Sequence, residues 1–315
     1  MAGERILTNG LQVVVVLGPT ATGKTELAIR LAKAFDGEVV SADSRYFYRG
    51  MDIGTAKPSI EEQAGVPHHL IDILDPSDGY SLGQFLNDVY AAIESVGKRE
   101  RLPVVAGGTP QYLRAMLEGW TVPEVPPDDA LRERLDAEPT EALFDRLQAV
   151  DPASADRIGP SNKRRMIRAL EIYELSGQTM TELSGKQPPP YRFHIVGLTQ
   201  PREVLYPRID SRVRKMYAEG WLDEVRALHE KGITAAHPSM SAHGYREALE
   251  VVTGLTTEDD AIARTCTIIH RYVRHQQTWF RRFDDIHWFD SSTPGWQQAA
   301  EDPVRGFLGG SSESP

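Results

Sequence analysis

The chain has almost no cysteine and no long apolar run. Cys266 is the single cysteine among 315 residues, which excludes an internal disulfide framework and a zinc site built from cysteines, and leaves packing as its expected role. The first apolar run is short, unlike the core of a secretory signal, and no later stretch is long enough to cross a membrane. We therefore expect a cytoplasmic protein without a membrane partner.

Positive charge is also in deficit. Lysine and arginine number 35 against 45 aspartates and glutamates, which gives a formal net charge of −10 and argues on average against a nucleic acid partner. Phosphate contacts need only a local patch, however, and two basic clusters exist. They comprise Lys163, Arg164, Arg165 and Arg168, and Arg271, Arg274, His275, Arg281 and Arg282. Taken alone, each cluster is typical of a solvated helix face.

A glycine-rich octapeptide is the most informative segment. It follows the β-type run Val13 to Leu17 and precedes a helical apolar pattern, the strand–loop–helix order of a phosphate-binding P-loop. Its residues are Gly18, Pro19, Thr20, Ala21, Thr22, Gly23, Lys24 and Thr25. The glycines let the backbone wrap an anion, and the helix N-terminus presents free N–H groups to it. Lys24 adds a full charge, and the Thr25 hydroxyl is a candidate ligand for phosphate-bound Mg²⁺.

A carboxylate is predicted beside this loop. Asp43 follows a second strand, and groups just beyond the carboxyl ends of strands in open α/β sheets converge on one crevice. The strand at 103–106 ends in Gly107-Gly108-Thr109 and lacks the Mg²⁺-holding aspartate typical of nucleotide hydrolases. Asp43 is thus a candidate general base. A small-molecule kinase that uses ATP and a non-catalytic RNA-binding protein with a P-loop remain open.

Strand and helix patterns alternate along the first part of the chain. Predicted strands occupy residues 12–17, 38–41, 68–73, 103–106, 194–198 and 286–289, and helical patterns include 24–35 and 82–97. This order predicts an α/β fold of the P-loop, nucleoside-triphosphatase-like type. Its sheet is expected to be mostly parallel and flanked by helices, with a helical insertion domain.

Prolines divide the chain into segments. Residues 1–122 form the first part of the predicted core, and 123–190 form a helical insertion between Pro123 and the prolines at 188–190. Residues 191–290 complete the core and are mainly helical. Residues 291–315 are rich in serine, glycine and proline, which favours a disordered tail.

Several strings resemble the tRNA dimethylallyltransferases, also called tRNA isopentenyltransferases. They are GPTATGKT, SADS, YRGMDIGTAKP, GVPHHLIDILDP, GGT with YLRAMLEG, NKRRMIRALE, RIDSRV, GWLDEV, GYRE and QQTWFRR. Together they extend over nearly the whole chain outside its termini, and DIGTAKP is far more specific than the P-loop. Tyr46, Pro110-Gln111 and His243 depart from the family, which usually has Gln, Gly-Leu and an apolar residue there.

The resemblance implies transfer of a dimethylallyl group from dimethylallyl diphosphate to the exocyclic amine of the adenosine 3′ of the anticodon in tRNA. It implies catalytic roles for Lys24, Thr25, Asp43 and Arg212, with Mg²⁺ on Thr25. The implied tRNA-binding residues are Asp43, Ser44, Arg45, Tyr46, Thr109, Arg164, Arg165 and Arg168. The expected partners are the tRNA anticodon stem-loop and dimethylallyl diphosphate, and we expect a monomer.

Overall fold

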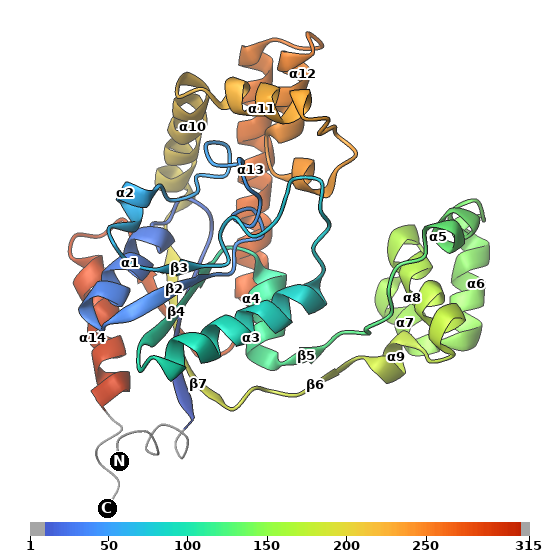
Figure 1. The fold of residues 1–315 in the computed structure, drawn as a ribbon, viewed down its shortest axis with the longest axis horizontal. Helices are drawn as coiled ribbons and strands as arrows, with labels where there is room; N and C mark the ends of the chain where they lie inside the picture. Colours follow the sequence, from blue (N-terminus) through green and yellow to red (C-terminus); the bar gives the residue numbers. More distant parts are fainter. Residues whose placement is uncertain (1–9, 310–315) are drawn as a thin grey trace, which may run out of the picture. The chain divides into compact units, whose positions relative to one another are not determined.

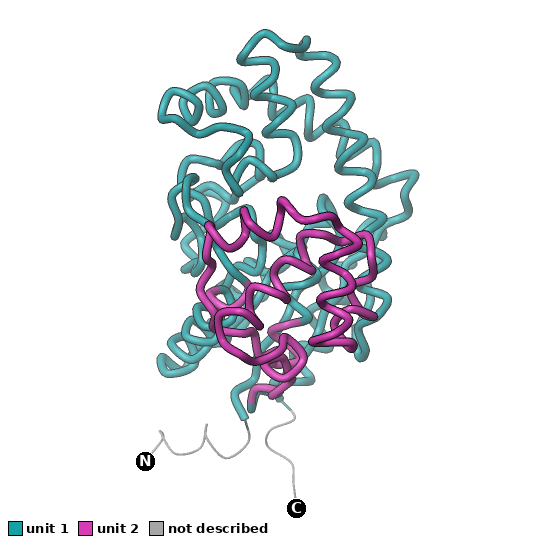
Figure 2. The backbone as a smooth tube through the Cα atoms, turned by 90° about the vertical axis from the view of Figure 1, so that its right-hand side faces the viewer, with its two compact units in different colours: residues 1–81, 85–114, 190–315 teal, residues 82–84, 115–189 magenta. Residues whose placement is uncertain are grey.

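The structure is a computed structural model that describes residues 10–309. The chain forms two compact units, coloured separately in Figure 2. Unit 2 comprises residues 82–84 and 115–189, and the rest of the described chain belongs to unit 1. Among the described residues, no helix combines the length and the apolar character that crossing a bilayer requires.

A six-stranded sheet forms the centre of unit 1, with the strand order β3-β2-β4-β1-β7-β8 and parallel pairing throughout. The strands are β1 (Leu11–Leu17), β2 (Gly37–Ser41), β3 (His68–His69), β4 (Leu102–Gly107), β7 (Tyr191–Thr199) and β8 (Ile286–Asp290). Val13 to Leu17 are fully buried, so helices cover both faces of the central strand (Figure 1). The predicted α/β class is confirmed. The strand predicted over 68–73 is shorter, because Leu70 and Asp72 adopt positive φ angles that end it.

Helices on the two faces position the strand ends. α1 (Lys24–Ala34) follows β1, while α3 (Leu82–Lys98) and α4 (Pro110–Glu118) flank β4 in the sequence and α2 (Ile60–Gln63) precedes β3. Leu27 and Leu31 of α1 pack with Val14, Val104 and other strand residues in one buried cluster. The loop after β1 therefore leads directly into the N-terminus of α1, a helix held in place by its buried side chains.

The predicted disordered tail is wrong for the described part of 291–315. α14 (Trp296–Gly309) is a regular helix, and Trp296, Ala300 and Val304 join the cluster under α1. Glu301 of α14 also forms an ion pair with Arg30 of α1 at 3.0 Å. Trp296, Ala300 and Val304 are spaced four residues apart, as on one face of a helix, but the prediction of disorder followed from the serine, glycine and proline content of the segment. Residues 310–315 lie outside the described chain.

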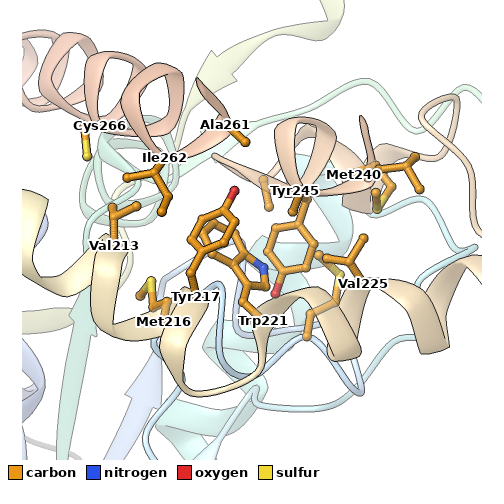
Figure 3. Close-up of a cluster of buried hydrophobic side chains, with 14 of the residues drawn as sticks. Val213, Met216, Tyr217, Trp221, Val225, Met240, Tyr245, Ala261, Ile262 and Cys266 are labelled. Atoms are coloured by element: carbon orange, nitrogen blue, oxygen red, sulfur yellow. The ribbon is translucent and has the colours of Figure 1, made fainter. Parts of the chain in front are cut away.

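The remaining helices of unit 1 form a second core. They are α10 (Arg202–Ala218), α11 (Trp221–Glu230), the 3-10 helix η1 (Pro238–Ser241), α12 (Tyr245–Val252) and α13 (Glu258–Phe280). Trp221 and Tyr245 are fully buried in this core (Figure 3). Met51, from the loop after β2, belongs to the same buried cluster. The loop and the helices therefore share one apolar core.

Unit 2 is mainly helical, with α5 (Asp129–Asp136), α6 (Thr140–Val150), α7 (Pro152–Ile158), α8 (Lys163–Ser176) and α9 (Met180–Leu183). β5 (Trp120–Thr121) pairs antiparallel with β6 (Gly185–Lys186). The long segment of the unit, 115–189, starts before the predicted residue 123, and the strand before Pro123 pairs within it. These two-residue strands carry no sequence pattern long enough to predict.

Candidate active site

The P-loop joins β1 to α1. Gly23 caps the helix with a φ angle of 93°, a left-handed conformation that favours glycine, so that α1 begins at Lys24. Lys24 Nζ donates to the carbonyl of Pro19 at 2.7 Å, and Thr22 Oγ1 donates to the same carbonyl at 2.8 Å. The loop is therefore braced by its own side chains, with the first turn of α1 directed toward it.

Asp43 lies just beyond β2, in the crevice next to this loop. Its Oδ1 accepts the N–H of Arg45 at 3.0 Å, and its own N–H lies 3.3 Å from Ser41 Oγ. Both contacts are local, so the second carboxylate oxygen has no hydrogen bond from another described residue that would hold it away from the crevice. The turn therefore orients the carboxylate and leaves one of its oxygens without a hydrogen bond from the described residues.

A cleft of about 990 Å³ is lined by all four predicted catalytic residues. Lys24 and Thr25 from α1, Asp43 and Tyr46 from the loop after β2, and Arg212 from α10 all line it. A smaller pocket of about 90 Å³ shares Lys24, Asp43 and Arg212 with the cleft. The smaller pocket adds the apolar side chains Ile209, Val213 and Ile269, and Met216 lines both pockets. Two cations and one carboxylate therefore lie next to an apolar recess, which is the part of the smaller pocket lined by these apolar side chains.

Burial changes the acid–base properties of this cluster. It lowers the pKa of Lys24 to about 8, with Asp43 acting in the opposite direction and Arg212 in the same one. Burial likewise lowers the pKa of Arg212, and it raises the pKa of Tyr46, an effect that neighbouring Asp43 strengthens. The phenol of Tyr46 is neutral and donates to the carbonyl of Ala56 at 2.9 Å. Tyr46 therefore supports the cleft wall as a hydrogen-bond donor.

The turn after β4 brings two predicted tRNA-binding residues together. Thr109 Oγ1 accepts the N–H of Ser44 at 3.2 Å and lies 3.2 Å from Ser44 Oγ. Arg45 belongs to the same region, and its Nη1 donates to Ser241 Oγ at 3.1 Å. The ends of β2 and β4 are thus linked by side chains that the sequence separates widely.

Gln276 of α13 is a site residue that sequence reasoning missed. It is 1% exposed, and its Oε1 accepts the N–H of Thr20 in the P-loop at 3.1 Å. Its Nε2 donates to the carbonyl of Gly108 at 2.6 Å, so one amide joins the P-loop to the turn after β4. Its place in the string QQTWFRR was the only available signal, because a buried glutamine has no periodic signature.

His243 and Tyr272 form the wall of the smaller pocket near Asp43. Their ring centroids are 4.3 Å apart, and the Tyr272 hydroxyl lies 3.3 Å from the carbonyl of Gly108. Burial, with Arg45 adding to it, lowers the pKa of His243 to about 4. The imidazole that replaces the usual apolar residue is therefore uncharged at neutral pH.

The first basic cluster lies on α8 in unit 2. Arg164 and Arg165 are exposed, whereas Arg168 is half-buried and donates to Glu171 Oε2 at 2.6 Å and to the carbonyl of Val125 at 2.7 Å. Glu171 is fully buried. Arg168 therefore stabilises the unit from within, while Arg164 and Arg165 point their charges to solvent.

The second basic cluster lies on α13 and just after it. Arg271, Arg274, His275, Arg281 and Arg282 are all exposed, and the Arg282 guanidinium lies 5.9 Å from the ring centre of Trp279. Of the aromatic residues in the same stretch, Phe280 is buried and Tyr272 lines the smaller pocket. The exposed residues form a solvated basic surface on the core unit.

Fold and site together define a P-loop protein in which the carboxylate of Asp43 lines the same cleft as the loop. The family model described as IPP transferase matches residues 46–283. The chain is 53% identical to a tRNA dimethylallyltransferase of Thermomicrobium roseum, with 94% of this chain and 91% of the relative covered. It is 48% identical to the enzyme of the same name from Roseiflexus castenholzii over 94% of this chain and 98% of the relative.

Solved structures agree with these relatives. A tRNA isopentenylpyrophosphate transferase of Bacillus halodurans has a TM-score of 0.71 and 39% identity, covering 95% of this chain and 96% of its own. A eukaryotic dimethylallyltransferase described as acting on tRNA has a TM-score of 0.83 and 26% identity, covering 96% and 80%. The chain belongs to the IPP transferase family.

Proposed function

We propose that this protein transfers the dimethylallyl group of dimethylallyl diphosphate to the exocyclic amine of the adenosine 3′ of the anticodon in tRNA, with release of diphosphate. The observation that carries the proposal is the shared pocket of Lys24, Asp43 and Arg212 at the P-loop. Because the proposed substrate is tRNA, we also propose that the protein acts in the cytoplasm.

Charge development explains why cations line this pocket. As the bond between the allylic carbon and the diphosphate oxygen breaks, negative charge grows on the leaving oxygen. Lys24, Arg212 and the N–H groups at the start of α1 are the groups that stabilise it. The apolar recess formed by Ile209, Val213 and other side chains has room for a five-carbon chain. The donor would therefore bind with its diphosphate at the loop and its hydrocarbon in the recess.

Asp43 is the proposed general base. The adenine amine is a weak nucleophile, and removing its proton as the new nitrogen–carbon bond forms prevents accumulation of positive charge on the base. The Asp43 carboxylate is oriented by the N–H of Arg45 and lies in the same pocket as Lys24. Ser44, Thr109, Arg45 and Tyr46 surround it and would hold the target nucleotide, which must leave its stack to reach the pocket.

Mg²⁺ is the proposed cofactor. Thr25 supplies a hydroxyl oxygen in the cleft, and no cluster of three or more His, Cys, Asp or Glu side chains able to hold a metal occurs in residues 10–309. This donor set fits Mg²⁺, which is commonly bound through phosphate oxygens, water and few protein ligands. When bound, Mg²⁺ would neutralise charge on the diphosphate. Thr25 would hold the ion at the first turn of α1.

A direct assay tests the proposed function. The protein is incubated with Mg²⁺, dimethylallyl diphosphate and unmodified tRNA, and we expect a mass gain of one dimethylallyl group on the tRNA and release of diphosphate. Omitting Mg²⁺ should abolish the gain. ATP consumption with a small-molecule acceptor would favour a kinase, and tRNA binding without any mass gain would favour a non-catalytic binder.

Salt-dependent binding tests the proposed tRNA contact of α8. Changing Arg164 and Arg165 together to alanine is expected to weaken tRNA binding. The slope of log Kd against log salt concentration should also decrease by about two, one for each lost phosphate contact, because each neutralised phosphate releases condensed counterions. Affinity for dimethylallyl diphosphate should not change. Titrations at two ionic strengths measure both effects.

The chain offers a matched control for this experiment. Arg134 and Arg146 of unit 2 are paired with Glu174, so that their double alanine variant removes equal charge from the same unit. A similar loss of tRNA affinity in both double variants would contradict a specific role of Arg164 and Arg165.

A further inference from the structure

The segment from Met51 to Lys57 forms a wall of the active-site cleft. Thr55 and Ala56 line both the cleft and the smaller pocket, as Lys24 and Arg212 do. The carbonyl of Ala56 accepts the hydroxyl of Tyr46 at 2.9 Å. The position of this wall therefore determines the space available beside the diphosphate loop.

One carboxylate from a distant helix holds the segment in place. Glu224 of α11 accepts the N–H groups of Asp52 and Ile53 at 2.7 Å each through Oε2, and Gly54 N lies 3.3 Å from its Oε1. Three successive backbone N–H groups thus converge on a single anion, an arrangement in which the charge strengthens each hydrogen bond. Glu224 does not line either pocket. Its effect on the site must pass through the segment.

The packing around Glu224 leaves little freedom for movement. The Tyr245 hydroxyl donates to Glu224 Oε1 at 2.6 Å. Tyr245 also packs edge-on against Trp221, with ring centroids 5.4 Å apart (Figure 3). Trp221 in turn lies against Gly54, where a Cβ atom would come within 2.0 Å of the indole nitrogen. The carboxylate and the segment are therefore fixed relative to each other from both sides.

The segment is also tied within itself. Ala56 N donates to the carbonyl of Ile53 and Lys57 N to that of Asp52, each at 3.0 Å. The buried Lys57 ammonium contacts Asp52 Oδ1 at 2.6 Å. These bonds make a compact turn, so a displacement of residues 52–54 would also move Thr55 and Ala56. Without an anion at Glu224, three converging N–H groups would lack their acceptor.

We propose that Glu224 is a positioning residue for the donor. It holds the wall formed by Thr55 and Ala56 at the distance from Lys24 and Arg212 that an allylic diphosphate requires. The identity of that donor rests on the function proposed above, whereas the coupling of Glu224 to the wall does not.

Glu224→Gln tests this role with little change in volume. Glutamine offers one acceptor oxygen in place of two, and its NH₂ group would face an N–H or O–H donor that it cannot accept from. We therefore expect the backbone amide hydrogens of residues 51–57 to exchange with solvent at least about tenfold faster than in the unaltered protein. The value of kcat/KM for the donor is expected to fall about 10–10²-fold, as for a small misplacement of the site. The Kd for tRNA should stay within about twofold. Glu230→Gln removes a charge from the exposed end of the same helix and should leave every readout unchanged.

Two further measurements separate this proposal from the function itself. Calorimetric titration with inorganic diphosphate reports on the wall without any group transfer, and Tyr245→Phe keeps Glu224 while removing the hydroxyl that aims it. We expect weaker diphosphate binding in Glu224→Gln and a smaller change in the same direction in Tyr245→Phe. Unchanged exchange over 51–57 and unchanged diphosphate binding in Glu224→Gln would overturn the proposal. Absence of tRNA alkylation by the unaltered protein would overturn the proposed function alone.

Discussion

Replacing Asp43 with asparagine is expected to slow dimethylallyl transfer about 10²–10⁴-fold, the usual contribution of a positioned general base. The amide keeps the shape of the side chain and its contact with the N–H of Arg45, but it cannot take the proton of the attacking amine. The Kd for tRNA should be nearly unchanged, so the loss should fall on kcat. Single-turnover assays with saturating tRNA and donor measure the chemical step directly.

Asp36→Asn is a suitable control for this experiment. Asp36 is exposed, outside both pockets, and has a φ angle of 48°, a conformation that asparagine adopts readily. Its activity should equal that of the unaltered protein. Near-normal single-turnover rates in Asp43→Asn would contradict the assignment of Asp43 as the base.

Removing the Lys24 ammonium should have the second-largest effect. Lys24→Ala takes away a charge that opposes the developing negative charge on the leaving diphosphate, which we expect to cost about 2–4 kcal/mol of transition-state stabilisation. That corresponds to about a 30- to 10³-fold loss in kcat/KM for the donor. Lys33→Ala, on the exposed face of the same helix, provides a control of equal charge change.

The pH dependence offers a second test of Lys24. Because burial lowers its pKa to about 8, the ammonium is present below that pH and is lost as the pH rises through it. The value of kcat/KM for the donor, which reports on the free enzyme, should therefore fall above about pH 8. The residual activity of Lys24→Ala should lack this decline. The same decline in both proteins would show that another group titrates.

Thr25 can be separated from Lys24 by its metal dependence. Thr25→Ala removes the one hydroxyl proposed to hold Mg²⁺, so its residual activity should require a higher Mg²⁺ concentration than that of Lys24→Ala. Mg²⁺ titrations of both variants measure this difference. An unchanged Mg²⁺ requirement in Thr25→Ala would contradict the proposed ligand role.

The sequence by itself determined the sheet, the P-loop and the neighbourhood of Asp43. Each depends on short-range features: a β run, glycines at fixed spacing, and the rule that carboxyl ends of parallel strands share one edge. The positions of Lys24 and Asp43 in one pocket follow from these features alone. The helix over Trp296–Gly309 also depends on residues close together in the sequence, but the serine- and glycine-rich composition around it favoured a prediction of disorder.

Only the tertiary structure decided which distant side chains complete the site. Gln276 reaches the P-loop across 256 positions of sequence, and Glu224 reaches Asp52 across 172. The tertiary structure likewise shows that Arg168 donates hydrogen bonds to Glu171 and to the carbonyl of Val125, whereas Arg165 on the same helix is exposed. The physical reason is the same in each case. A single polar residue acquires its role from the partner that the folded chain brings to it, and neither residue type nor spacing encodes that partner.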